Sequence, residues 1–400
     1  MEEWKECRLG DICKTNINSY SEKDNWSFVN YLDTGNITEN KISDIQFIDL
    51  SSEALPSRAR RKVQLNDIIY STVRPNQKHF GIIKNQPENF LVSTGFAVLH
   101  INKIIADPNF IFYNLIQNEN TESLHAIAEQ TTSAYPAIKP SDIENLSIKL
   151  PPLPTQQKIA AILSSLDDKI ELNNKINTNL EQQAQALFKN WFVDFEPFGG
   201  KMPEGWKVGK LSDILRLKKN PIQPGEDTSL PYLPIDLIPI KSLAIREVRP
   251  NEEALSSLSR FDENDILIGA MRVYFHRVAI APFDGITRTT CFVLEPFNPN
   301  YFAYSAITCN QDLAIDYAQK TSKGSTMPYA VWEGGLGDFE IPIPDEATAA
   351  KFNNIVKPLL EQIKKSYFEN KILQEIRESL LPKLMNGETV VLSKIKNQIP

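Results

Sequence analysis

The sequence predicts an α+β protein made of two similar domains with mixed or antiparallel sheets, joined by two long antiparallel helices that pair as in a coiled coil. Three observations predict this class. One heptad-spaced stretch lies in mid-chain, a second lies near the C-terminus, and the first half of the chain recurs in the second half at an offset near 200 residues. The chain therefore has a pseudo-two-fold internal repeat, in which each half is a globular domain followed by a long helix.

The central helix is predicted from Thr155 to Leu187, after a proline-rich segment and before the break at Pro197. Apolar, small and amide side chains recur along it at alternating spacings of four and three. This spacing is typical of a helix buried along one narrow seam. The seam positions are Ile159, Leu163, Leu166, Ile170, Asn173, Asn177, Leu180, Ala184 and Leu187.

A distal helix with the same spacing is predicted near the C-terminus, after the N-cap candidate Asp345 and before the C-cap candidate Asn386-Gly387. Its seam positions are Phe352, Val356, Leu359, Ile363, Ser366, Asn370, Leu373, Arg377, Leu380 and Leu384. We expect the two helices to pack against each other. Polar seam residues would cost stability if unpaired, so we expect them to pair and fix the helix register; they are Asn173, Asn177, Ser366 and Asn370.

The segments that precede the two helices match each other in order. The matched pairs are Leu9–Ile12 with Leu211–Ile214, Asn66–Ile69 with Asn264–Leu267, Ser93–Leu99 with Thr289–Leu294, and Thr131–Pro136 with Lys323–Pro328. Short β-branched and aromatic runs predict strands, and Phe110–Glu129 and Asn300–Gln319 predict helices. The predicted organisation is a domain at 1–153, a helix at 154–197, a domain at 198–344, a helix at 345–388 and a tail at 389–400.

Composition limits the classes of function. The 400 residues are 42% hydrophobic and 23% charged, which is ordinary for a globular protein with more than one core. The four cysteines form no C-x-x-C pair and have no histidine at ligand spacing, so we expect neither a metal site nor disulfides. No apolar run approaches the roughly 20 residues that cross a bilayer, and residues 1–6 lack signal-peptide character. We therefore expect a cytoplasmic protein without membrane contact.

Four segments resemble the specificity subunit of type I restriction-modification systems: Leu150–Ile159 (LPPLPTQQKI), Leu166–Ile170 (LDDKI), Trp191–Phe195 (WFVDF) and Leu380–Glu388 (LLPKLMNGE). The resemblance covers the whole chain and implies two target recognition domains, each reading one half of a bipartite, asymmetric target in double-stranded DNA. It also implies that the helix pair sets the gap between the halves and that methyltransferase (modification) and restriction/translocase subunits dock on it. The chain itself would be non-catalytic and bind no cofactor, while the partner subunits carry S-adenosylmethionine, ATP and Mg.

Base reading needs hydrogen-bond donors in fixed geometry, usually Arg for guanine and Asn or Gln for adenine. The first domain offers these types together in one loop at Arg74, Asn76, Gln77, Lys78 and His79, which Pro75 stiffens. An exposed hairpin tip without a DNA contact is the alternative. The densest positive run, at Arg58, Arg60, Arg61 and Lys62, is suited to phosphate contact or is an ordinary charged face.

In the second domain the equivalent loop lacks Pro and Asn-Gln, so we expect it to read different bases. Its candidate residues are Arg272, Tyr274, His276 and Arg277, with Arg288, Lys323, Ser325 and Thr326 as further candidates or as parts of flexible turns. Neither domain is basic: residues 1–150 carry 15 Lys and Arg against 19 Asp and Glu, and residues 201–344 carry 15 against 18. We therefore expect weak affinity for DNA from the chain alone and strong affinity in a complex.

Three large apolar side chains, Trp191, Phe192 and Phe195, come directly after the predicted central helix. They either pack against the helix pair or form a docking surface for a methyltransferase subunit.

Two other classes of function remain as alternatives. A catalytic DNA methyltransferase or nuclease would need an amide-Pro-Pro-aromatic motif, a cofactor glycine loop or a triad. The nearest strings, Asn298–Tyr301 and Gly334–Gly337, lack the second proline and the strand-turn-helix context. We therefore predict no catalytic residues. A scaffold protein that binds no DNA would leave the polar loops unexplained.

Overall fold

The computed structural model describes residues 4–130 and 136–387, and its contacts group the chain into two compact units. The first unit consists of residues 1–167 and 375–400, and the second of residues 168–374. The boundaries fall inside the two long helices, so each unit contains a globular part together with one segment of each helix. The predicted tail at 389–400 and residues Thr131–Tyr135 of the repeat lie outside the described residues.

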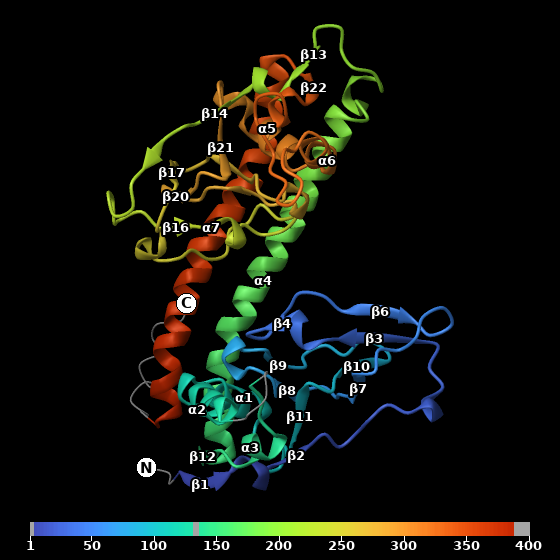
Figure 1. The fold of residues 1–400 in the computed structure, drawn as a ribbon, viewed down its shortest axis with the longest axis vertical. Coiled ribbons are helices and arrows are strands. Elements are labelled where there is room, and N and C mark those ends of the chain that lie inside the picture. Colours follow the sequence, from blue (N-terminus) through green and yellow to red (C-terminus); the bar gives the residue numbers. More distant parts are fainter. Residues whose placement is uncertain (1–3, 131–135, 388–400) are drawn as a thin grey trace. The chain divides into compact units, whose positions relative to one another are not determined.

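Two four-stranded sheets form the globular part of the first unit (Figure 1). One sheet has the order β6 (Gln46–Asp49), β3 (Phe28–Leu32), β10 (Phe90–Ser93), β7 (Ala59–Lys62), with β3 and β10 parallel. The other is antiparallel, with the order β2 (Cys13–Thr15), β11 (Phe96–Ile101), β8 (Ile68–Ser71), β9 (Phe80–Ile82). Two-stranded pairs join β1 (Lys5–Arg8) to β12 (Ser147–Leu150) and β4 (Ile37–Thr38) to β5 (Lys41–Ile42). The helices are α1 (Pro108–Leu115), α2 (Asn118–Glu129) and α3 (Pro140–Glu144).

The second unit repeats this arrangement. Its antiparallel sheet has the order β14 (Leu215–Leu217), β21 (Cys291–Pro296), β18 (Ile266–Gly269), β19 (Val278–Ile280). Its mixed sheet has the order β15 (Pro221–Ile222), β17 (Leu258–Phe261), β20 (Gly285–Arg288), β16 (Tyr232–Leu233), with β16 and β20 parallel. The strand β13 (Lys207–Lys210) pairs with β22 (Glu340–Ile343), and the helices are α5 (Phe302–Cys309) and α6 (Asp312–Lys320). The predicted α+β class with an internal repeat is confirmed.

The helices predicted as single segments at Phe110–Glu129 and Asn300–Gln319 are each broken into two. The break in the first unit falls at Ile116-Gln117, between α1 and α2, and that in the second at Asn310-Gln311, between α5 and α6. In each unit the first of the two helices, α1 or α5, is almost wholly buried, whereas the second, α2 or α6, exposes one face. The chain therefore turns where a buried helix is followed by one that is exposed on one face.

The central helix, α4, runs from Leu153 to Phe192, and the distal helix, α7, from Glu346 to Met385. Trp191 and Phe192 are therefore the last residues of α4 and do not follow it. Gln156 is buried at the start of α4, where its side chain accepts a bond from Asp107 N at 2.9 Å and donates to Pro151 O at 2.8 Å. These bonds fix the start of α4 against the N-terminus of α1.

Within the second unit α4 and α7 run antiparallel, because Asn173 bonds Asn370 while Phe192 packs on Phe352 with ring centroids 4.8 Å apart. Within the first unit, Asp167 accepts a bond from Arg377 Nη1 at 2.7 Å. The fold class therefore includes the predicted antiparallel helix pair.

The buried face of α4 follows the predicted seam as far as Asn177 and again at Ala184. Beyond Asn177 the other buried positions are Glu181, Phe188 and Phe192, while the predicted Leu180 and Leu187 are only partly buried. A straight helix with 3.6 residues per turn drifts away from a heptad seam. In this segment α4 also packs on the globular part of the second unit, so the buried stripe broadens and shifts by one residue.

Candidate nucleic-acid interface

In the first unit, the candidate base-reading residues lie on a tight turn between β8 and β9. The turn is a 3₁₀ segment, Pro75–Gln77, flanked by two left-handed residues, Arg74 with φ 48° and Lys78 with φ 55°. The backbone N–H of Arg74 donates to Pro136 O at 2.9 Å, and Pro75 is buried beneath the turn. Arg74, Asn76 and Gln77 are exposed together at its tip, as a base-reading loop requires.

Lys78 and His79 are held by the segment around β4. Lys78 Nζ donates to Glu39 Oε1 at 2.8 Å, and His79 Nδ1 lies 2.5 Å from Ile37 O. Burial alone would raise the pKa of Glu39. The hydrogen bond and the positive charge of Lys78 outweigh this effect, so the pKa of Glu39 lies below its usual value. These two predicted site residues therefore brace the turn, while the other three form its exposed tip.

The second unit builds the same frame between β18 and β19. The 3₁₀ segment Val273–Phe275 is flanked by Arg272 with φ 51° and His276 with φ 52°, and Val273 is buried where the first unit has Pro75. Arg272 N donates to Pro328 O at 2.8 Å, as Arg74 N does to Pro136 O. The two turns are thus structural equivalents, and their tips differ: Asn76-Gln77 in one and Tyr274-Phe275 in the other.

The structure brings two separately predicted loops of the second unit together. The turn after Lys323 is closed by two bonds between the backbones of Lys323 and Tyr329, each 2.9 Å, and the adjacent Pro328 bonds Arg272. Lys323, Ser325 and Thr326 are all exposed. They lie on the hairpin that supports the Arg272 turn, a contact that no local sequence pattern predicts.

His276 and Arg277 have their polar atoms directed into the protein. His276 is 5% exposed, and its Nδ1 and Nε2 lie 3.1 Å from Asp312 Oδ1 and 3.0 Å from Asn310 Oδ1. Arg277 Nη1 donates to the carbonyls of Asp236 and Ile238, and burial lowers the pKa of its guanidinium. These two predicted site residues position the turn and are not presented at its tip. Arg288 is half-buried at the end of β20, in the other sheet.

The basic run of the first unit does not form one continuous positive surface. Arg58 is exposed, but Arg60, Arg61 and Lys62 are half-buried on β7, where successive side chains point to opposite faces. Lys62 Nζ bonds Asp24 Oδ1 at 2.5 Å and lies 5.3 Å from the centre of the Trp26 ring. Burial lowers the pKa of Arg61, whose Nε is buried without a hydrogen-bond partner among the described residues. Lys62 therefore serves the fold, and Arg58 is the most accessible member of the run.

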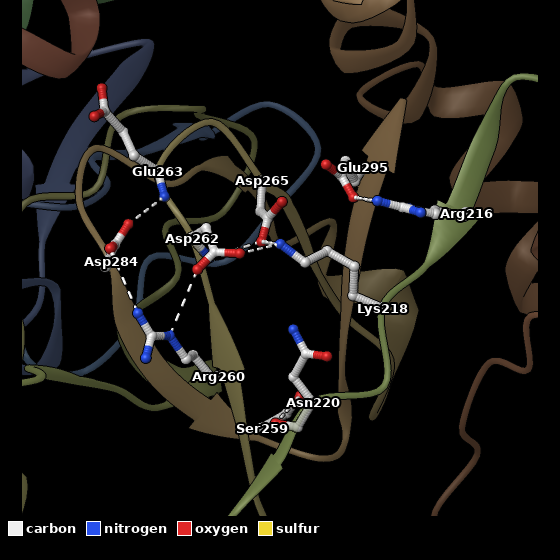
Figure 2. A network of polar contacts seen from close by, with 10 residues as sticks. All are labelled: Arg216, Lys218, Asn220, Ser259, Arg260, Asp262, Glu263, Asp265, Asp284 and Glu295. Atoms are coloured by element: carbon white, nitrogen blue, oxygen red, sulfur yellow. Dashed lines mark hydrogen bonds and ion pairs between the residues drawn. The ribbon is translucent and has the colours of Figure 1, made fainter. Parts of the chain in front are cut away.

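A polar network fixes another turn of the repeat in the second unit (Figure 2). Lys218 Nζ lies between two carboxylates, 2.5 Å from Asp262 Oδ2 and 2.8 Å from Asp265 Oδ2, and Asp265 Oδ2 also accepts from Asp262 N at 2.7 Å. Arg260 lies 3.5 Å from Asp262 and 3.7 Å from Asp284. The ammonium group occupies the centre of this acidic cluster, so the network stabilises the turn.

The first unit has the same turn, with a histidine in place of the lysine. Asp67 Oδ2 accepts from Gln64 N at 2.7 Å, and His100 Nδ1 lies 2.9 Å from Asp67 Oδ1. Asn66 and Asn264 occupy the same left-handed position, with φ 73° and 72°. The repeated Asn-Asp pair recognised in the sequence is therefore a structural turn. Within residues 4–130 and 136–387, no group of three or more His, Cys, Asp and Glu side chains could hold a metal ion.

The aromatic residues at the end of α4 are core residues to different degrees. Phe192 is 2% exposed and packs on Tyr304 and Phe352 at 4.7 and 4.8 Å between ring centroids. It fills the interior of the second unit and is not presented to a partner, as one of the two interpretations expected. Trp191 and Phe195 are partly buried against the same cluster.

The polar seam residues pair only in part. Asn173 Nδ2 donates to Asn370 Oδ1 at 2.8 Å, which crosses the two helices as expected. Ser366 Oγ instead donates to Gln362 O of its own helix at 3.1 Å. Asn177 Oδ1 is buried and lacks a hydrogen-bond partner among the residues that the structure describes. The register bond is therefore carried by Asn173 and Asn370.

An exposed apolar surface on the helices was not predicted from the sequence. Leu172 and Ile176 on α4 are 51% and 38% exposed, and Phe368 and Ile372 on α7 are 46% and 56% exposed. All four belong to the second unit, as one i, i+4 pair on each helix, and we call the two pairs together the mid-helix patch. Each helix has an apolar i, i+4 pair outside the heptad seam, and this pattern would have predicted an exposed apolar surface. The heptad spacing alone does not include these positions.

The sequence matches the family described as the type I restriction modification DNA specificity domain over residues 1–182 and again over residues 203–378. The chain belongs to this family. It is 27% identical over 462 residues to the type I restriction enzyme HindI specificity subunit of Haemophilus influenzae, covering 97% of this chain and all of that protein. It is 30% identical over 305 residues to the MjaIX specificity subunit of Methanocaldococcus jannaschii, covering 70% of this chain and 68% of that protein.

A solved structure gives the same fold. The S subunit of a type I restriction-modification system from M. genitalium matches with a TM-score of 0.55 at 16% identity and covers 96% of both chains. The two matched segments of the DNA specificity family include the two repeated globular parts, one in each unit. None of the described helices is both long enough and apolar enough to cross a membrane.

Proposed function

We propose that this chain is the non-catalytic DNA-specificity subunit of a type I restriction-modification complex, in which each unit reads one half of a bipartite, asymmetric DNA target. The main support is the pair of equivalent turns. Arg74 and Arg272 start the same left-handed frame in the two units, yet the exposed tips are Asn76-Gln77 and Tyr274-Phe275. A shared frame with different tips suits two readers of different bases.

The long helices suit a role as a spacer between the two readings. Each spans 40 residues, about 60 Å at 1.5 Å per residue. Because the Asn173–Asn370 bond fixes their register in the second unit, one helical turn added to both helices would lengthen the spacer by about 5.4 Å, or one to two base pairs.

We further propose that the mid-helix patch is a docking surface for a modification subunit. A specificity subunit acts with other subunits of its enzyme, and exposed apolar i, i+4 pairs on a helix are typical of protein contacts. The partly exposed Trp191 remains a second candidate for this contact. The partner subunits would carry S-adenosylmethionine, ATP and Mg, together with the methyl transfer, translocation and cleavage, and this chain would bind none of these cofactors. The absence of a membrane partner and a cytoplasmic location are part of the same proposal.

The central experiment is a methylation assay with the purified chain and its modification subunit. The chain alone should transfer no methyl group, and the mixture should methylate adenines only within one split sequence motif, which mapping of methylated adenines in cells with and without the chain identifies. Methyl transfer by the chain alone would favour the catalytic alternative. Methylation without sequence preference would favour a scaffold.

Two substitutions assign the halves. Arg74→Ala should weaken discrimination in one half of the target by about 1–3 kcal/mol and leave the other half read normally. Arg8→Ala, an exposed arginine of the same unit on β1, is the matched control and should change neither half. Equal loss in both halves would indicate a folding defect and would remove Arg74 from the reading surface.

The docking proposal is tested by co-purification. Ile176→Asp should reduce binding of the modification subunit while leaving the thermal stability of the chain unchanged. Ile104→Asp, at an 87% exposed apolar residue outside the mid-helix patch, is the control and should bind normally. Normal assembly of Ile176→Asp would reject the patch as the docking surface.

A further inference from the structure

The tip of the second turn is unusual because its two aromatic rings are exposed although the frame around them is buried. Tyr274 is 44% and Phe275 39% exposed, while Val273 between β18 and the tip is 2% and His276 is 5% exposed. The supporting hairpin adds Met327 at 52% and Tyr329 at 43% exposure. A grouped apolar surface of this kind on a small turn calls for a ligand with apolar features.

These rings are held rigidly. The centroids of Tyr274 and Phe275 lie 4.9 Å apart at an interplanar angle of 48°, and the guanidinium of Arg277 lies 5.8 Å from the centre of the Phe275 ring. Arg277 itself donates to the carbonyls of Asp236 and Ile238. His276, between Phe275 and Arg277, is held by contacts of its two ring nitrogens with Asp312 and Asn310. The exposed edges of the rings therefore have a defined place before any ligand arrives.

We propose that Tyr274 and Phe275 read thymine 5-methyl groups in the major groove of the half-target that the second unit recognises. The inference rests on the proposed function and adds the base feature that this unit recognises. Phenylalanine has no hydrogen-bonding group, and the thymine methyl group is the one apolar feature that a base pair presents in the major groove. Contact between an aromatic ring and this methyl group is an established form of direct readout.

Insertion of the rings between base steps fits the geometry less well. A wedge that unstacks two base pairs needs both faces free to contact the bases. Phe275 has Tyr274 packed beside it and the Arg277 guanidinium above its ring. The pair is therefore built to present ring edges to a groove.

The first unit supplies an internal comparison. Its tip has Asn76 and Gln77 at the equivalent positions, and amide side chains read the hydrogen-bonding edge of adenine. Removing thymine methyl groups should thus affect one half of the target and spare the other. This asymmetry separates methyl readout from a general effect of altered DNA.

The test uses the full-length chain assembled with its modification subunits and duplexes carrying the mapped target. Each thymine of one half is replaced by deoxyuracil, which removes only the methyl group. The half read by the second unit is the one that Arg74→Ala leaves unaffected. Replacement there should weaken binding about fourfold for each contacted methyl group, and replacement in the other half should change it less than twofold.

Two variants then connect the effect to the tip. In Phe275→Ala the penalty for deoxyuracil should disappear at the thymine that Phe275 contacts, because that contact is already lost. Phe297→Ala, at a 60% exposed phenylalanine elsewhere in the same unit, should keep the full penalty. If Phe275→Ala fails to fold, the duplex series with the unmodified chain still decides the question.

Specific binding that is indifferent to deoxyuracil in the second half would overturn the inference and leave the proposed function standing. The inference would also be overturned if the half-target read by the second unit contained no A·T pair, or if the full deoxyuracil penalty survived in both Tyr274→Ala and Phe275→Ala. Loss of all sequence preference in the unmodified complex would instead overturn the proposed function itself.

Discussion

The bond between Asn173 and Asn370 should couple the two long helices energetically. Asn173 Nδ2 donates to Asn370 Oδ1 at 2.8 Å, and the two residues are 3% and 8% exposed. Asn370→Leu removes the acceptor and leaves a buried amide donor unpaired. The desolvation of one such group costs about 1–3 kcal/mol, so the variant should be destabilised by that amount.

Replacing both partners should remove most of this cost. In the double variant Asn173→Leu, Asn370→Leu neither member of this bond is left buried and unpaired, and apolar side chains of similar size then fill the seam. The half-buried Asn174 Oδ1 also loses its 3.4 Å bond from Asn370 Nδ2, but this oxygen can be rehydrated. Such paired replacements are nearly neutral or stabilising. The double variant should therefore be at least as stable as the unchanged chain, and the two single effects should be strongly non-additive.

The measurement is urea and thermal unfolding followed by tryptophan fluorescence. Three of the five tryptophans, Trp191, Trp206 and Trp332, lie in the second unit, so the signal reports mainly on that unit. A loss of 1–3 kcal/mol corresponds to a fall in Tm of about 2–12 °C for a unit of roughly 200 residues. Asn179→Leu, an exposed position on α4, is the control and should stay within about 0.5 kcal/mol.

The reasoning would be refuted by single variants as stable as the unchanged chain, or by single losses that simply add in the double variant. Either result would mean that the two amides contribute no coupling. The helix register would then depend on apolar packing alone.

Two further predictions concern the attachment of α7. Asp345 Oδ1 accepts from Thr348 N at 2.9 Å and its Oδ2 accepts from Trp206 Nε1 at 3.1 Å, so Asp345→Ala should cost about 1 kcal/mol in thermal unfolding. The bond from Thr348 N lowers the pKa of Asp345. The stabilisation by Asp345 is therefore present above the pKa of an unfolded aspartate and is lost as the pH falls through the lower folded pKa. The difference in stability between the unchanged chain and Asp345→Ala should accordingly disappear in acid. The same difference in stability at acid pH would contradict a capping role for Asp345. Lys364 is 4% exposed and bonds Glu263 Oε1 at 2.7 Å. Because Glu263 is 53% exposed and can be rehydrated, Lys364→Met should cost only about 1 kcal/mol and speed hydrogen exchange at the turn before β18; a loss above 3 kcal/mol would show that the carboxylate is trapped.

The long helices were predictable because their signal is local and repeated. The spacing from Ile159 to Asn177 identifies the buried face correctly, and Asp345 was identified as the cap of α7 from sequence. The shift of the buried face to Glu181 and Phe188 was not predictable in the same way. It depends on the globular part of the second unit, whose packing no local pattern encodes.

The candidate site was predicted at the level of loops and only partly at the level of side chains. Arg74 lies on an exposed turn, as the adjacent Pro75 and Asn76 indicate, and Tyr274 lies on the equivalent turn, as the internal repeat indicates. His276 looked equally available, but its partners Asn310 and Asp312 are more than 30 residues away in the chain. Burial of this kind is set by tertiary neighbours, which composition cannot reveal.

The equivalence of the two turns explains why the repeat is visible in the sequence although the tips differ. Both frames have an Arg in the left-handed region, a bond from its backbone N–H and a buried Pro or Val after it. The two tip residues that follow are solvent-exposed and contribute little to the frame. They are therefore free to differ between the units without loss of stability.

The pairing of the basic side chains bears on how an acidic chain can meet DNA. Lys62, Lys78 and Lys218 each bond a carboxylate of their own unit. Such cations release few phosphate counterions on binding, and the net charge of the chain is −7. The exposed turn tips instead carry the groups that, in the proposed function, recognise base edges. Contacts of this kind add specificity without much phosphate attraction, so the chain by itself should bind DNA with a shallow dependence on salt, and the complex with its partner subunits should bind with a steep one.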